Sequence, residues 1–220
     1  MFYEPDNNDH GLPYNPVKAC VVPRPIGWIT TVDGAGKVNA APFSFFNVLS
    51  YDPPFCVFSA GGHVDDEEEK DSVRNVKETG EFVYNMATWD QRDAMSETGM
   101  IIDRAADELS ATGLEPLPSN IVKVPRIKGS PVQFECKLQE IVVLPGHTKS
   151  HIHHVVFGRV VGVHVDDAAI NEDGLLDMDR IRPIARLGYK DYCWVDSSNM
   201  FQMEKRSPEE LIGKPRQAAE

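Results

Sequence analysis

The sequence predicts a mainly β domain, an antiparallel barrel decorated by inserted helices. Turn signals that join neighbouring strands as hairpins outnumber β-α-β units along the 220 residues. Residues 132–139 alternate strictly between apolar and polar side chains, as expected for a half-exposed antiparallel strand. These two observations favour an antiparallel barrel over a doubly wound parallel sheet.

The first half contains strands separated by clear turn signals. Residues 1–16 are rich in Pro, Asn and Asp and predict an irregular arm. Because Pro42 cannot donate a ladder hydrogen bond, we expect a sheet edge or a β-bulge there. The expected strands cover residues 20–22, 26–31, 38–49 and 55–60, with a hairpin turn at 33–36.

The most helix-like segment of the first half is Lys70–Thr79, after an acidic run at 65–69 that we interpret as a solvated loop. Asp71 or Ser72 can cap its start, and Gly80 suits the position after its end. Helix N-termini attract anions, so the first turn is a candidate anion site.

The second half predicts two short helices followed by a return to strands. We expect a single domain over residues 17–196 and a C-terminal extension over 197–220 that frays toward its end. The expected elements are a strand at 81–86, helices at 89–98 and 105–112 around an irregular 99–102, strands at 132–139 and 155–165, and a last ordered element at 180–194.

Composition and charge exclude several classes of partner. The chain is 41% hydrophobic and 25% charged, which is ordinary for a globular protein. No apolar run approaches the ~20 residues of a membrane-spanning helix, and the N-terminus lacks the features of a secretion signal. The net charge of −12 disfavours nucleic acid, which is bound through lysines and arginines. We expect a cytoplasmic protein with neither a membrane nor a nucleic-acid partner.

Cysteines and histidines give no metal signature. The cysteines are far apart and form no C-x-x-C pair, so we expect reduced thiols that act as small hydrophobes. His151 and His153 share a strand face, but no cysteine or clear carboxylate completes a zinc site. The chain also lacks the Rossmann, P-loop, G-x-S-x-G and H-E-x-x-H motifs. The four cysteines are Cys20, Cys56, Cys136 and Cys193.

Several motifs occur in order at compatible spacings. They are RPIGWITT at 24–31, NAAPFSFFN at 39–47, DPP at 52–54, KDSxxN at 70–75 and GEFVxN at 80–85. Together they resemble the flavin reductase-like FMN-binding split-barrel family, which includes flavoredoxin, over about Val17 to Asp196. The resemblance implies a split β-barrel of antiparallel Greek-key type and a homodimer with FMN in a groove at or near the subunit interface.

The resemblance also implies where FMN lies. Lys70 and the helix N-terminus suit the phosphate, whereas Ala41, Pro42 and Ser44 lie against the isoalloxazine ring. Thr30 and Thr31 point to opposite strand faces, so at most one hydroxyl reaches the groove. We expect the three phenylalanines of 43–46 to belong to the core. The candidate cofactor-binding residues are Arg24, Trp28, Thr30, Thr31, Asn39, Ala41, Pro42, Ser44, Asn47, Ser59, Lys70, Asp71, Ser72 and Asn75.

A histidine shortly before the glycine that matches Gly158 would lie near the nicotinamide of NADH or NADPH, according to the resemblance. His153 and His154 both qualify by spacing, but neighbouring strand residues face opposite ways, so only one can serve. The flavin N5 accepts the hydride, and no side chain needs to act as an essential acid or base.

The expected function is an FMN-dependent oxidoreductase that takes hydride from NAD(P)H. It would pass electrons to free flavin, a partner oxygenase or another acceptor. Two alternatives remain open: an electron carrier reduced by another protein, and a split barrel that has lost flavin and serves as a binding module.

Overall fold

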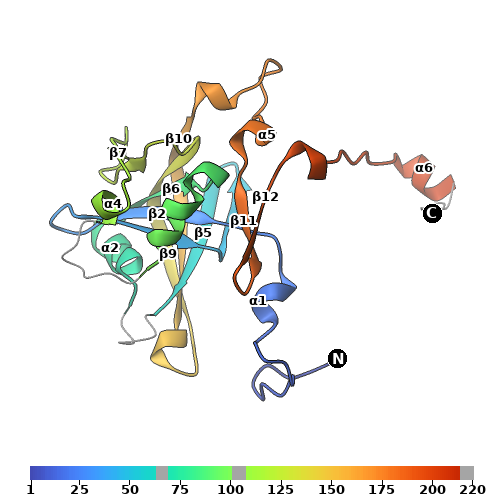
Figure 1. Ribbon diagram of the computed structural model, residues 1–220, viewed down its shortest axis with the longest axis horizontal. Coiled ribbons are helices and arrows are strands. Elements are labelled where there is room, and N and C mark those ends of the chain that lie inside the picture. The colour runs from blue at the N-terminus through green and yellow to red at the C-terminus, as the bar shows by residue number, and fades with distance from the viewer. Residues whose placement is uncertain (63–68, 101–107, 214–220) are drawn as a thin grey trace.

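The computed structural model describes residues 1–62, 69–100 and 108–213 (Figure 1). Most of the acidic run at 65–69, the end of the irregular 99–102 and the start of the helix expected at 105–112 lie outside these residues. The domain boundaries at 16/17 and 196/197 stay predictions.

The main sheet closes on itself through two consecutive strands. Its edge strands β3 and β4 follow each other in sequence, separated only by Ser44 and Phe45, so the sheet curls until its edges meet. The Ser59 amide donates a hydrogen bond of 2.8 Å to the Phe45 carbonyl, which holds this junction against the sheet. The predicted antiparallel split barrel is confirmed. Among the described residues its strand order is β3 (Val38–Phe43), β2 (Gly27–Val32), β6 (Glu81–Met86), β9 (Val132–Leu144), β10 (His153–Val165), β5 (Pro54–Gly61) and β4 (Phe46–Tyr51).

The long strand predicted over residues 38–49 is wrong, because the chain breaks at Ser44 and Phe45 to pass from one sheet edge to the other. No bulge occurs at Pro42. It pairs with Trp28 in an uninterrupted register, and its lack of an N–H group is tolerated because β3 is an edge strand. The alternative of a sheet edge is therefore the correct one.

Helix α2 (Asp71–Thr79) packs Val73 and Val76, both fully buried, into a core that includes Phe58 and Phe82. Gly80 follows the helix with φ +71° and donates its N–H to the Val76 carbonyl, so the predicted helix end is confirmed. The predicted cap is wrong. Lys70 occupies the N-cap position and makes no side-chain capping bond, and Asp71 lies inside the first turn.

Gly158 of β10 allows a close approach of its backbone to a buried ring. A Cβ atom there would lie 2.2 Å from Cζ of Phe82, so only glycine leaves room for this buried ring. The register of β10 against β9 also shifts beside Gly158 and Gly162, which bends the strand.

The strict alternation expected over 132–139 holds only in part. Gln133 and Glu135, predicted to face solvent, are buried, and Glu135 has no exposed surface. The loop 119–125 covers this face of β9 and supplies hydrogen-bond donors to Glu135. The covering loop is distant in sequence from the alternating residues, so their period could not reveal it.

A smaller sheet and several short helices complete the fold. The segment predicted as a strand at 20–22 is not a strand: Cys20 ends α1 (Val17–Cys20), and the two valines after it belong to the irregular connection to β1. No helix of the described residues is both long and apolar enough to cross a bilayer. The other elements are β1 (Arg24–Pro25), η1 (Trp89–Gln91), α3 (Arg92–Glu97), α4 (Glu108–Ala111), β7 (Pro116–Leu117), β8 (Arg126–Ile127), η2 (Lys149–His151), η3 (Asp167–Ala169), α5 (Met178–Ile181), β11 (Ile184–Gly188), β12 (Asp191–Trp194), η4 (Ser197–Asn199) and α6 (Pro208–Gly213).

Candidate functional site

The start of β3 and the first turn of α2 bring four candidate residues together. Asn39 Nδ2 donates a hydrogen bond of 2.9 Å to Ser72 Oγ, and Asn75 Nδ2 donates one of 3.1 Å to Thr31 Oγ1. Ser72, Asn75 and Thr31 are buried, whereas Asn39 is half-buried. Two strands and a helix that are separated in sequence thus present hydroxyl and amide groups at one place.

Charges around this first turn favour an anion. The Asp71 carboxylate pairs with Arg74, and the Glu69 carboxylate pairs with Lys77. Both carboxylates are therefore offset by a cation, and Lys70 is the N-cap residue, at the positive end of the helix dipole. This helix N-terminus can therefore attract an anion such as phosphate.

Trp28 and Thr30 lie on the strand face opposite Thr31. Trp28 Nε1 donates to Thr98 Oγ1 at 2.9 Å, and Thr30 Oγ1 donates to the Pro125 carbonyl at 2.7 Å. Both side chains are fully buried. The prediction that Thr30 and Thr31 point to opposite faces is confirmed, and Thr31 is the one that faces α2.

A second group forms where β5 ends and β10 begins. Ser59 Oγ and His153 Nδ1 are 3.0 Å apart, and the His153 ring centroid lies 5.7 Å from that of Phe45. The Arg24 guanidinium carbon lies 5.7 Å from the same Phe45 ring, and Arg24 also donates to the Val21 carbonyl at 2.9 Å. The Phe45 ring therefore lies next to both the Arg24 guanidinium and the His153 imidazole.

His153 and His154 do face different partners. His154 Nε2 lies 2.9 Å from Glu69 Oε1, whereas His153 joins Ser59 and Phe45. Burial lowers the pKa of His153, and the nearby Lys18, His151 and His154 lower it further. Burial also lowers the pKa of His154, although the Glu69 carboxylate opposes that shift.

The Glu69–His154 contact connects the two groups. It places the residue just before the α2 N-cap against the start of β10, next to His153. The polar group at α2 and the Phe45 group at β10 thus belong to the same end of the barrel. An elongated ligand with an anionic end and a planar end matches such a pair of sites.

The remaining candidates lie along β3 and the junction after it. Ala41, Pro42 and Ser44 are half-buried, whereas Asn47 is exposed and its Oδ1 accepts the Val48 N–H at 2.9 Å. The structure therefore leaves Asn47 apart from both groups.

Sequence reasoning missed Phe45 and Glu69. Phe45 was expected in the core together with Phe43 and Phe46, but it is 39% exposed, while Phe46 is buried and Phe43 packs against the core. The exposed side chain results from the break between β3 and β4, and no local signal indicated that break. Glu69 belongs to an acidic run that was interpreted as a solvated loop, yet its carboxylate is paired.

The described residues contain no group of three or more His, Cys, Asp or Glu side chains that could hold a metal ion. Cys56 and Cys136 are buried thiols with their sulfur atoms 3.7 Å apart, and Cys20 is exposed.

Comparison with known proteins agrees with this geometry. Residues 19–185 match the flavin reductase like domain. A protein from Aquifex aeolicus is 41% identical over 179 residues, which cover 81% of this chain and 88% of that protein.

Solved structures extend the comparison to the fold. Nitrilotriacetate monooxygenase component B from Bacillus cereus superimposes with a TM-score of 0.83 and 28% identity, over 92% of this chain and 98% of that chain. A split-barrel structure from Shewanella frigidimarina superimposes with a TM-score of 0.77, at 22% identity over 94% of this chain and 100% of that chain.

Proposed function

The chain belongs to the flavin reductase-like domain family, and from this premise we propose that it binds FMN and catalyses NAD(P)H-dependent flavin reduction. The observation that carries the proposal is the Asn39–Ser72 hydrogen bond of 2.9 Å, which joins the β3 wall to the first turn of α2. This contact supports a continuous site in which a strand wall for a ring adjoins a helix N-terminus for a phosphate.

The residues present fit FMN. The Asn39 amide, the Ser72 hydroxyl and the Lys70 ammonium are donors, as a phosphate requires. Ala41 lies on the same face of β3 as Asn39 and offers a half-buried apolar surface for a ring, whereas Pro42 faces the other side of the strand. Bound FMN would supply the hydride acceptor, and the protein would orient it and tune its potential through hydrogen bonds to the ring edge.

His153 is the histidine that we assign to the nicotinamide side. It adjoins Ser59 and Phe45, two groups that can orient a ring and its carboxamide. Burial lowers its pKa, which favours the neutral imidazole. We therefore assign it an orienting role through its ring nitrogens rather than a role as a general acid.

The reduced flavin would pass electrons to free flavin or to a partner oxygenase. The Bacillus cereus protein is named as one component of a monooxygenase, which supports a two-protein arrangement. The four cysteines are free thiols, in keeping with the reducing cytoplasm, where NAD(P)H is available.

We also propose a homodimer through the face around β4. This edge strand exposes Val48, Leu49 and Tyr51, and Tyr51 is 91% exposed. An exposed apolar edge strand is an aggregation hazard unless another chain covers it. Sedimentation of a monomer at micromolar concentration, with and without FMN, would contradict this proposal.

An anaerobic titration of the FMN-loaded protein with NADH, and then with NADPH, tests the proposed reaction. We expect at least one nucleotide to bleach the visible flavin absorption. FMN binding without bleaching would favour an electron carrier, and failure to bind FMN at all would favour a binding module. Either result overturns the reductase proposal.

His153→Asn should lower the bleaching rate at least tenfold and leave the Kd for FMN within about threefold. His147→Asn, a change at an exposed histidine, is the matched control. An unchanged rate in His153→Asn would remove this residue from the nicotinamide side.

A further inference from the structure

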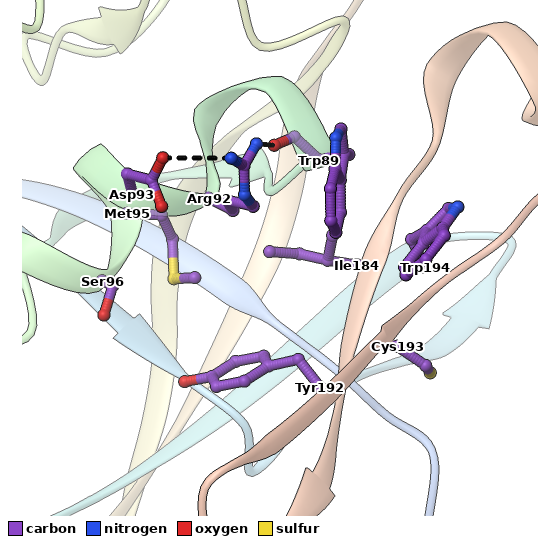
Figure 2. A pocket seen from close by; sticks show the side chains of 9 residues that line it. All are labelled: Trp89, Arg92, Asp93, Met95, Ser96, Ile184, Tyr192, Cys193 and Trp194. Carbon is purple, nitrogen blue, oxygen red and sulfur yellow. Dashed lines mark hydrogen bonds and ion pairs between the residues drawn. The ribbon is translucent and has the colours of Figure 1, made fainter.

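A second concave site lies apart from all the candidate flavin residues. It is a cavity of about 230 Å³ between α3 and strands β11 and β12 (Figure 2). The β12 strand contributes Tyr192 and Trp194, and α3 contributes Arg92 and Met95. None of the cofactor-binding candidates is among its described lining residues.

Three aromatic side chains, Trp89, Tyr192 and Trp194, line this cavity. The rings of Trp89 and Trp194 are in contact, with centroids 4.5 Å apart and planes inclined by 47°, so together they form one angled wall. Figure 2 shows the Tyr192 ring extending along another side of the cavity, below Met95 and Ile184. Aromatic walls with an apolar lining favour a flat, apolar ligand body.

The volume limits the ligand to one ring. An engineered apolar protein cavity of ~150 Å³ accommodates benzene. The cavity of about 230 Å³ therefore has room for one six-membered ring with one or two small substituents, and it is too small for a fused three-ring system such as a flavin.

A cation lines one side of the cavity. The Arg92 guanidinium carbon is 4.3 Å from the Trp89 ring centroid. Arg92 is fixed by a hydrogen bond of 2.8 Å to the Trp89 carbonyl. In a chain with a net charge of −12, an arginine held at an aromatic cavity favours an anionic ligand.

A carboxylate can compete for Arg92. Its present anionic partner is the neighbouring Asp93, with Nη2 and Oδ2 3.3 Å apart and the Asp93 side chain 81% exposed. Such an exposed pair is weak because water screens it. A ligand that pairs its carboxylate with Arg92 and packs its ring against Trp89 would also bury apolar surface, which the Asp93 side chain does not do.

We propose that this cavity binds a monocyclic aromatic carboxylate, with its ring against Trp89, Trp194 and Tyr192 and its carboxylate at Arg92. This site goes beyond the proposed flavin chemistry and does not require bound flavin.

Benzoate is the probe for this proposal, and tryptophan fluorescence is the readout. Two of the three tryptophans line the cavity, and the third, Trp28, is fully buried. We expect saturable quenching by benzoate, at least tenfold weaker binding of the uncharged benzyl alcohol, and the same benzoate affinity with and without saturating FMN.

Arg92→Gln should weaken benzoate binding at least tenfold, whereas Arg159→Gln, a change at an exposed arginine of β10, should not. Trp194→Leu, which removes one ring of the angled wall, gives a second test if Arg92→Gln fails to fold. Three results would each overturn the proposal: no saturation by benzoate, unchanged affinity in both variants, or benzoate binding only in competition with FMN.

Discussion

Replacing Glu135 by Gln tests how the barrel holds the loop 119–125. The carboxylate is fully buried and accepts the backbone N–H groups of Asn120, Ile121 and Val122 at 2.6–2.9 Å. His164 Nε2 lies 2.5 Å from its other side. Gln would place a donor amide against these donors, and the buried groups would lose their partners.

The pKa of Glu135 gives the size of this effect. Burial alone raises that pKa, but the hydrogen bonds from Asn120, His164, Val122 and Ile121 outweigh burial and lower it to about 2. A depression of ~2–3 units corresponds to ~3 kcal/mol of folding free energy, at ~1.4 kcal/mol per unit. Because the folded pKa lies below the unfolded one, this stability is present above about pH 4.5 and is lost as the pH falls toward 2.

Urea unfolding at pH 7 and pH 3 measures both effects. We expect Glu135→Gln to lower the free energy of unfolding by ~2–4 kcal/mol at pH 7. We also expect the variant to lose less stability than the unmodified protein on acidification. Glu140→Gln is the matched control, since Glu140 lies on the same strand and is exposed. A difference below ~0.5 kcal/mol at pH 7 between Glu135→Gln and this control would refute the reasoning.

Three further substitutions test other parts of the structure. Ser44→Ala should weaken FMN binding about twofold to tenfold by calorimetry, since one hydrogen bond contributes ~0.5–1.5 kcal/mol, and unchanged affinity would remove Ser44 from the site. Trp28→Phe should cost ~1–3 kcal/mol in urea unfolding because the Thr98 hydroxyl loses its buried donor, and a neutral result would contradict that role. Gly158→Ala should lower the free energy of unfolding by ~1–3 kcal/mol because the new methyl group meets Phe82, and full stability would show that the ring can move.

Local patterns predicted much of the fold. The Gly80 helix end and the strand 81–86 depend on residues only a few positions apart, and both agree with the structure. The motifs also indicated the family, because their order and spacing along the chain follow from the path of the chain through the barrel.

The candidate site was predicted only as a set of residues. By sequence His153 and His154 were equal candidates for the nicotinamide side. The structure distinguishes them by their contacts, because His153 lies against Ser59 and His154 against Glu69. The exposure of Phe45 followed from a strand break that its own sequence neighbourhood does not encode.

The sequence by itself determined most of the strand and helix segments and the family, because hydrophobic period and turn chemistry act over a few neighbouring residues. Tertiary structure alone decided which side chains meet. Glu135, polar in an alternating strand, is buried because partners 13 to 29 positions away in sequence satisfy its carboxylate. The same holds for the two walls of the candidate flavin site, since Asn39 reaches Ser72 across 33 positions. Burial and hydrogen bonding depend on distances in space, and these residues become neighbours only when the chain folds into the barrel.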